Sequence, residues 1–221
     1  MTFRSLAPAF FVALLGACSI GDGAPHDAIS ASVPSQAWQE NVPSAMRGHE
    51  RSTMRILIAG DLLPHRPMLS EPSQIASALA PLRDLFASAD AVVANYETAT
   101  GDPKDAGARD LVYGVDPAWM DAVAGSGVTA LTLANNHACD LGREGLEASI
   151  AAARGSVVAL GADDEDAWRA RTIAEKNGHR VCAVAWTEFT NDPRGRCERS
   201  GELAMAPLGR KGTERAVNAI R

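Results

Sequence analysis

Residues 131–142, with the sequence LTLANNHACDLG, constrain the fold more than any other stretch of the chain. The apolar, β-branched run 128–133 that leads into them has the length and composition of a buried strand. Two asparagines and a histidine follow at 135–137, and a helical pattern occupies 144–154. Strand, polar tip and helix in this order are typical of an α/β sheet that carries its chemistry at the carboxyl ends of its strands. Such polar groups are costly to bury unless something binds them.

The same layout occurs twice upstream. Residues 55–60 form an apolar run that ends at Asp61, and residues 91–95 form another that continues into Glu97. Alternating strands and helices predict an α/β fold with a mostly parallel sheet, right-handed crossovers and flanking helices. In that fold Asp61, Glu97 and residues 136–137 all follow carboxyl ends of strands, so we expect them to converge on one edge of the sheet.

Local patterns predict several of the remaining elements. Spacings of three and four between apolar residues predict a helix over 73–87, which Pro81 should kink or split. Asn177-Gly178, between two apolar or alternating runs, is a strong hairpin signal. Thr213 has the character of an N-cap residue and predicts a helix that begins after it.

Composition limits the partners that the chain can have. It contains 221 residues, 46% of them hydrophobic, which suits one domain of ordinary size. Its net charge of −6 and its low aromatic content argue against a nucleic-acid surface, because such surfaces need clustered basic residues or stacking platforms. We therefore expect no nucleic-acid partner.

The N-terminus has the features of an export signal. Arg4 supplies a short basic flank, and residues 6–15 form an apolar run too short for a stable membrane span. Small residues then precede Cys18, an arrangement that resembles a bacterial lipoprotein signal in which Cys18 is lipidated. An ordinary secretory peptide is the alternative. We expect an exported protein anchored to the membrane by its N-terminal lipid, in the outer membrane or periplasm if the host is Gram-negative.

The domain organisation follows from this interpretation. Residues 1–17 are the predicted signal peptide, and residues 18–52, rich in Gly, Ala, Ser and Pro, are a flexible tether. Residues 53–221 form the folded domain.

Three cysteines then remain in an oxidising compartment. Cys182 and Cys197, in a predicted strand and in the loop after it, are the pair that we expect to form a disulfide, although sequence alone does not determine connectivity. Cys139, two residues beyond His137, is either a small residue at a helix start or a metal ligand.

The polar groups at the predicted sheet edge form a set of hard oxygen and nitrogen ligands, which suits Mn²⁺, Fe or Zn²⁺. Each alone has an ordinary explanation: Asp61 as a turn or cap residue, Glu97 as a solvated loop residue, His137 as an exposed turn residue. Together with a divalent metal they would neutralise a phosphate and activate water, and His137 could act as a general acid. Neither a Gly-x-Ser-x-Gly elbow nor a Walker loop is present.

Three motifs resemble the CapA family of poly-γ-glutamate capsule biosynthesis proteins, relatives of the calcineurin-like metallophosphoesterases. They are GDLLPHR at 60–66, NYE at 95–97 and, longest and most specific, LANNHACDLGREG at 133–145. The resemblance runs from about residue 55 to 206. It implies a metallophosphoesterase-like fold, in which two sheets pack between helices.

The resemblance also implies a role for each matching residue. Asp61 would be a metal ligand, Glu97 a bridging carboxylate and Asn136 an amide-oxygen ligand. His137 would be the acid beside a scissile phosphate or amide. The residues that would orient these groups or the substrate are His65, Asn95, Asn135 and Asp140.

The chain departs from the family in two places. Leu63 stands where the related phosphoesterases have a histidine, and the family's later His-Trp-Gly and Gly-His-His-Pro-His segments do not occur before Arg221. We therefore expect a domain that is incomplete at its C-terminus and contains the first half of the two-sheet sandwich.

Two classes of function fit these features. The first is an exported CapA-like protein of capsule or surface-polymer biosynthesis, with a metal-dependent hydrolase-type site for an anionic polymer, phosphate or amide substrate. The second is a non-catalytic, membrane-anchored accessory protein for anionic polymer export, or an inactive truncated fragment.

Overall fold

The computed structural model describes residues 12–17, 53–64, 69–106, 111–192, 195, 197, 200–207 and 209–220. The domain from Met54 onward forms one unit, to which the strand β1 (Val12–Ala17) also belongs. The predicted tether, 18–52, lies outside the described residues.

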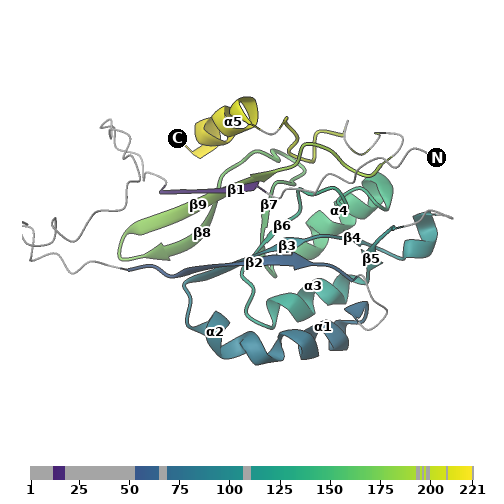
Figure 1. Cartoon of the computed structure of the whole chain (residues 1–221), viewed down its shortest axis with the longest axis horizontal. Helices are drawn as coiled ribbons and strands as arrows, with labels where there is room; N and C mark the ends of the chain where they lie inside the picture. The colour runs from purple at the N-terminus through teal and green to yellow at the C-terminus, as the bar shows by residue number, and fades with distance from the viewer. Residues whose placement is uncertain are drawn as a thin grey trace, which may run out of the picture. The chain divides into compact units, whose positions relative to one another are not determined.

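A four-stranded parallel sheet forms the centre of this unit (Figure 1). Its strands, in spatial order, are β2 (Ile56–Leu62), β3 (Ala91–Tyr96), β6 (Ala130–Thr132) and β7 (Val158–Leu160). Every neighbouring pair is parallel, and all six residues of β3 are buried. The predicted α/β fold with a mostly parallel sheet is confirmed.

Helices connect these strands and form a layer on one face of the sheet. They are α1 (Pro72–Leu79), the 3-10 turn η4 (Ala80–Leu82), α2 (Arg83–Ala87), α3 (Pro117–Ala124) and α4 (Gly142–Ala153). Within the layer α1 packs against α3, and α3 against α4. The predicted break at Pro81 is confirmed, because the helix passes through the 3-10 turn at that residue.

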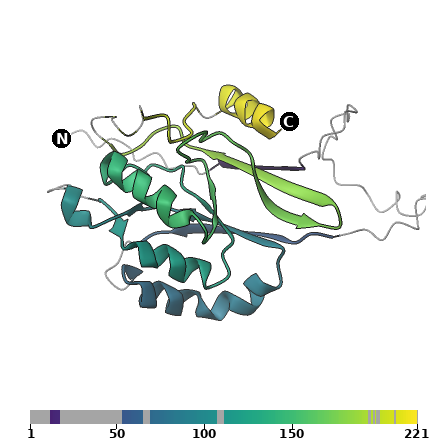
Figure 2. The same cartoon turned by 180° about the vertical axis from the view of Figure 1, so that it is seen from behind.

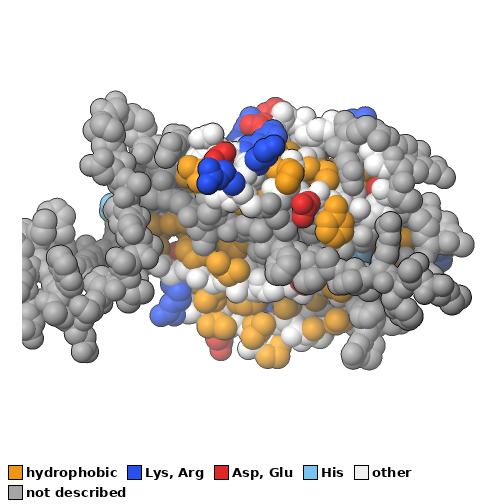
Figure 3. Space-filling view, turned by 45° about the horizontal axis from the view of Figure 1, so that its top comes forward, with side chains coloured by type: hydrophobic (Ala, Val, Ile, Leu, Met, Phe, Trp, Pro, Cys, Tyr) orange, Lys and Arg blue, Asp and Glu red, His pale blue; other side chains and the backbone are white. Residues whose placement is uncertain are grey.

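The outer face of the helix layer is partly apolar. Leu82 and Leu85 are 40% and 50% exposed there. Figure 3 shows hydrophobic side chains gathered in the lower part of the face in view. Leu82 lies in η4 and Leu85 in α2, whereas the polar residues singled out by the sequence lie at the strand ends.

A second, antiparallel sheet consists of β1, β9 (His179–Trp186) and β8 (Arg171–Lys176), in that order. The helix α5 (Arg210–Ile220) packs on β9 and β1, so the second sheet lies between α5 and the parallel sheet (Figures 1 and 2). The hairpin between β8 and β9 is confirmed: Asn177 and Gly178 have φ values of 51° and 77°, as a two-residue hairpin turn requires.

The strand β1 involves residues that the sequence assigns to a signal peptide. It pairs antiparallel with β9, from Val12 opposite Trp186 to Ala17 opposite Val181. The structure is that of the full sequence from Met1, so it does not test cleavage before Cys18, which stays a prediction. Cys18 itself lies outside the described residues. Among the described helices, none combines the length and apolar character needed to cross a membrane.

One expectation about local structure is wrong. Thr213 is not an N-cap, because α5 already begins at Arg210 and the Thr213 hydroxyl donates to the carbonyl oxygen of Gly209 at 3.0 Å. The stretch after Glu97 contains the short parallel strands β4 (Ala99–Thr100) and β5 (Gly114–Val115) and the turn η5 (Pro103–Ala106).

Candidate functional site

Strand register brings the first polar residues together. Asp61 in β2 lies beside Asn95 in β3, and Asn95 lies beside Thr132 in β6. A register irregularity in β2 between Ile58 and Asp61 sets this alignment. The carboxyl ends of β2, β3 and β6 therefore form one polar edge, as parallel strands must.

A buried network of amides holds this edge. The Asn95 Nδ2 donates to the Asp61 Oδ1 at 2.9 Å, and the Asn95 Oδ1 accepts from the Thr132 hydroxyl at 2.8 Å. The Asn135 Nδ2 donates to the Asn95 Oδ1 at 3.1 Å and to the Tyr96 carbonyl oxygen at 2.8 Å. The Asn135 Oδ1 accepts from the His137 backbone N–H at 2.9 Å. Because Asn95 and Asn135 are engaged with the protein, they act here as supports.

His137 is buried and fixed by a carboxylate. Its Nδ1 lies 2.8 Å from the Asp140 Oδ2, and the side chains are 10% and 1% exposed. The Asp140 Oδ2 also accepts from the Tyr113 backbone N–H at 2.8 Å. With the Nδ1 proton directed at this carboxylate, the neutral ring keeps its lone pair on Nε2.

Two loop residues complete the surroundings of His137. The Tyr113 ring packs edge-on against the imidazole, with centroids 4.7 Å apart. The Asn191 Nδ2 lies 3.3 Å from the His137 Nδ1, and the Asn191 backbone N–H donates to the Asn136 carbonyl oxygen at 2.7 Å. Sequence reasoning missed Tyr113 and Asn191, because nothing in their local sequence indicates that their loops fold back to this histidine.

Glu97 and Asp61 form a pair of interacting carboxylates. Burial, then the nearby Asp61 carboxylate and a hydrogen bond with it, together raise the pKa of Glu97 to about 7. Glu97 is half-buried, whereas Asp61 is exposed. The Asp61 carboxylate thus disfavours the ionised form of Glu97, and a cation bound to both would favour it.

Asn136, the residue before His137 in the chain, has an unused side-chain oxygen. Its Oδ1 is buried and has no hydrogen-bond partner among the described residues, a costly state that a bound ligand would relieve. The described residues contain no cluster of three or more His, Cys, Asp or Glu side chains able to hold a metal. Asp61, Glu97 and the Asn136 amide are a donor set that fits a hard divalent cation. His65 lies outside the described residues.

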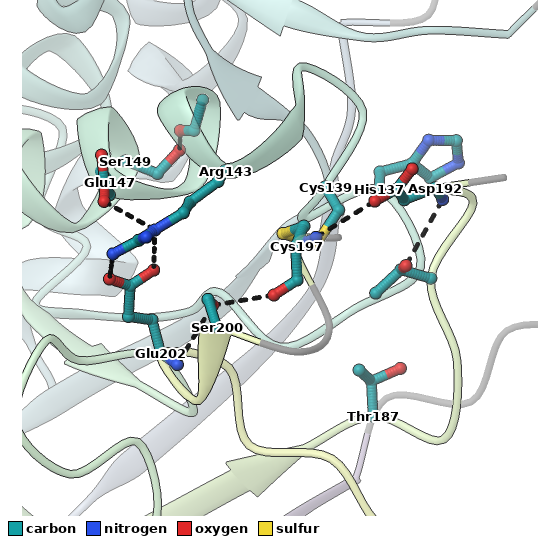
Figure 4. Close-up of a disulfide and its surroundings, with 12 residues drawn as sticks. His137, Cys139, Arg143, Glu147, Ser149, Thr187, Asp192, Cys197, Ser200 and Glu202 are labelled. Atoms are coloured by element: carbon teal, nitrogen blue, oxygen red, sulfur yellow. Dashed lines mark hydrogen bonds and ion pairs between the residues drawn. A yellow bond between two sulfur atoms is a disulfide. The ribbon is translucent and has the colours of Figure 1, made fainter. Parts of the chain in front are cut away.

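A disulfide joins two loops beside this site (Figure 4). It links Cys139 to Cys197, with the Cα atoms 5.8 Å apart and a sequence separation of 58. The expected Cys182–Cys197 pair is wrong, because the chain after β9 folds back over residues 135–141 and so brings Cys197 to Cys139. Cys182 has an interaction partner elsewhere in the chain. The disulfide also removes Cys139 as a metal ligand.

Comparison with known proteins agrees with the resemblance seen in the motifs. No curated protein matches the chain. The family model of the bacterial capsule synthesis protein PGA_cap matches residues 55–220, which include the parallel sheet, the polar edge and the disulfide. The chain therefore belongs to the PGA_cap family of bacterial capsule synthesis proteins.

Proposed function

We propose that this capsule synthesis protein binds a divalent cation at Asp61, Glu97 and Asn136 and acts on a phosphate or amide group of an anionic surface polymer or its precursor. Two observations carry this proposal: the interacting carboxylates of Glu97 and Asp61, and the buried amide oxygen of Asn136, which has no hydrogen-bond partner among the described residues. A structural role accounts for Asn95 and Asn135, because their side chains hydrogen-bond to each other and to the protein around them. It does not account for the carboxylate pair or for the Asn136 amide oxygen.

The electrostatics of the pair support a cation. With a pKa of about 7, Glu97 is close to half protonated at neutral pH in the metal-free chain. A divalent cation between Glu97 and Asp61 would favour both ionised forms and offset their repulsion. It would also supply the charge needed to bind an anionic phosphate and to activate water.

His137 is suited to moving a proton next to that position. The Asp140 carboxylate holds its Nδ1 and would stabilise the positive charge of a protonated ring. The protonated ring could then donate from Nε2 to a leaving oxygen or nitrogen. Since Asp140 itself is held by the Tyr113 backbone, the ring orientation is set before any substrate binds.

Turnover assays test the enzymatic part of this proposal. Purified full-length protein would be assayed with a phosphate monoester, a phosphate diester and a γ-linked glutamyl amide, each with Mn²⁺ and with a chelator. We expect Mn²⁺-dependent turnover of at least one substrate and a loss of about 10²-fold or more in His137→Ala, in line with removal of a general acid. His179→Ala, on the exposed end of the β8–β9 hairpin, is the matched control.

A cellular assay separates this function from a non-catalytic accessory role. If Asp61→Ala and His137→Ala together leave surface-polymer production unchanged, the site is dispensable and an accessory function is favoured. Loss of polymer with normal protein levels would support chemistry at the site.

Export and lipid anchoring form a separate part of the proposal. They rest on the apolar run 6–15 and the small residues before Cys18. Cell fractionation of wild type and Cys18→Ala tests them. We expect a membrane-bound, lipid-labelled wild type and an unlabelled variant. An unprocessed wild type that retains residues 12–17 would instead agree with the pairing of β1 on β9.

A further inference from the structure

The outermost strand of the parallel sheet, β7, has an edge that faces away from β6. The Val158 N–H donates to the Thr129 carbonyl oxygen at 2.9 Å, so the backbone groups of Val158 face β6. Because these groups alternate in direction along a strand, the next residue, Ala159, directs its N–H and carbonyl away from the sheet. Among the described strands, none lies beyond β7 in this sheet.

The chain that follows β7 has a partner on this same edge. The Ala204 N–H donates to the Gly161 carbonyl oxygen at 2.8 Å, and the Asp163 N–H donates to the Glu202 carbonyl oxygen at 2.9 Å. An antiparallel bridge forms between these two hydrogen bonds. The segment 202–204 therefore runs along the edge in the manner of one more strand.

This pairing stops before it reaches Ala159. Ala159 lies two residues before Gly161 and therefore points to the same side. Ala206 would be its partner if the pairing continued, but the Ala206 N–H donates to the Thr187 carbonyl oxygen at 3.1 Å instead. Within the part of the chain that the structure describes, no residue hydrogen-bonds to the outward groups of Ala159. One backbone donor and one backbone acceptor are therefore available at this point of the edge.

A cavity of about 660 Å³ lies at the same point and has Ala159 in its lining. Its apolar wall consists of Ile150 and Ala153 from α4 and of Val157 and Val158. Volumes of about 300–1,000 Å³ with an apolar lining and a few polar groups are typical of binding sites. Because burial of an unpaired charge against such a wall is costly, the cavity favours an uncharged side chain.

The charged side chains around the cavity are paired with one another. The lining contains three arginines and three carboxylates, so these groups carry no net charge. The three ion pairs are Arg154–Asp164, Arg169–Glu165 and Arg171–Asp163. Since each of these arginines already has a carboxylate partner, the cavity does not favour an anionic ligand. It differs in this respect from the polar edge, for which an anionic polymer is proposed.

We propose that this cavity binds an extended, uncharged segment of a partner polypeptide. The backbone of that segment pairs with the N–H and carbonyl of Ala159 and continues the row that residues 202–204 begin. One of its apolar side chains packs against Ile150, Ala153 and Val157. In such strand addition the main-chain hydrogen bonds provide affinity, and the pockets for side chains provide specificity.

Selection from a displayed library of short random peptides, on the immobilised full-length protein, tests this proposal. Val157→Trp fills the cavity from its apolar wall, and Ala151→Trp, exposed on α4 and outside the lining, is the matched control. We expect the selected peptides to contain apolar residues. They should bind wild type and Ala151→Trp at least about tenfold more tightly than Val157→Trp, because that variant excludes a buried apolar side chain.

A second measurement uses wild type alone and decides the matter if Val157→Trp does not fold. The selected peptides are prepared with a methyl group on each backbone nitrogen in turn. Pairing with Ala159 predicts that at least one position lowers the affinity about tenfold, since the methyl group removes a donor. The bound peptide should also slow hydrogen exchange of the Ala159 amide and leave that of Val158, which already donates to Thr129, unchanged.

Three outcomes would overturn the proposal. The first is a selection that enriches no peptide, and the second is a set of peptides that bind folded Val157→Trp as tightly as wild type. The third is binding that tolerates every backbone methyl group and leaves exchange at Ala159 unchanged. These measurements involve neither a metal nor the polar edge, so their result does not depend on whether the proposed function holds.

Discussion

The two sides of the candidate site differ in how their polar atoms are satisfied. On one side, Asn95, Thr132 and Asn135 are buried and bond to one another. On the other side, Glu97 has a pKa raised to about 7, and the Asn136 Oδ1 is buried with no partner in the part of the chain that the structure describes. The same sheet edge thus carries one satisfied set and one unsatisfied set.

This difference distinguishes support from binding. A satisfied buried network contributes to folding and specifies one arrangement of the strand ends. Unsatisfied groups persist in a folded protein only if the rest of the structure tolerates their cost, and they concentrate at functional positions. Substitutions on the two sides should therefore affect different quantities: the free energy of unfolding on the first, and ligand binding on the second.

The largest effect on stability is expected for Asn135→Ala. The variant removes the partner of the His137 backbone N–H, the Tyr96 carbonyl oxygen and the Asn95 Oδ1. The Asn95 Oδ1 keeps the hydrogen bond from Thr132, and each buried group left unpaired costs about 1–3 kcal/mol, so we expect the other two groups to give a loss of at least about 2 kcal/mol in urea unfolding. Asn218→Ala on the exposed face of α5 is the control. A loss as small as that of the control would mean that the network does not support the edge.

Thr132→Val should have a smaller effect on the same side. It replaces the hydroxyl that donates to the Asn95 Oδ1 by a methyl group of similar size. Because the Asn135 Nδ2 still donates to that oxygen, we expect a loss of only about 1 kcal/mol in the free energy of unfolding. A loss as large as that of Asn135→Ala would show that the network has no redundancy at Asn95.

The pH dependence of stability tests the second side. The pKa of Glu97 rises from 4.5 to about 7 on folding, so the folded state holds this proton more tightly. The stabilisation of the folded state that comes from this raised pKa is complete below pH 4.5 and is lost as the pH rises to about 7. Because Glu97 is half-buried and solvent screens it, we expect the metal-free chain to lose about 1 kcal/mol or less across this window. Glu97→Gln should flatten that part of the profile, and an unchanged profile would contradict the assignment.

Asp61→Asn should have the smallest effect on stability. The amide oxygen of the new side chain can still accept from the Asn95 Nδ2, and a carboxylate that repels Glu97 is removed. We expect the free energy of unfolding to change by less than about 0.5 kcal/mol, whereas cation affinity should fall at least about tenfold. Measurement of both quantities on one preparation separates the two sides. A strong loss of stability in Asp61→Asn would show that Asp61 supports the fold, like Asn95 and Asn135, and would contradict its assignment to ligand binding.

Local sequence signals predicted the parallel sheet and the residues at its edge. The hydrophobic runs before Asp61, Asn95 and Asn135 identify strands, and parallel strands must share a carboxyl edge. Asn177-Gly178 identified its hairpin for an equally local reason, since both residues need a positive φ.

Contacts made by returning loops could not be predicted in the same way. Tyr113 and Asn191 reach His137 from segments that precede it by 24 residues and follow it by 54. The disulfide partner of Cys197 depends on the path of the chain after β9, so closeness in sequence favoured Cys182 and led to the wrong pair. The raised pKa of Glu97 depends on burial and on Asp61, neither of which its own neighbours in sequence reveal.

The most direct test of the cation site is a Mn²⁺ titration of the oxidised, full-length protein, followed by the electron paramagnetic resonance signal of unbound Mn²⁺. We predict saturable loss of that signal in wild type, and none at matched concentrations in Asp61→Ala/Glu97→Ala that is folded by circular dichroism. Folded wild type that leaves the Mn²⁺ signal unchanged, also with Zn²⁺ and Fe²⁺ as competitors in a second titration, would contradict a cation site at this edge.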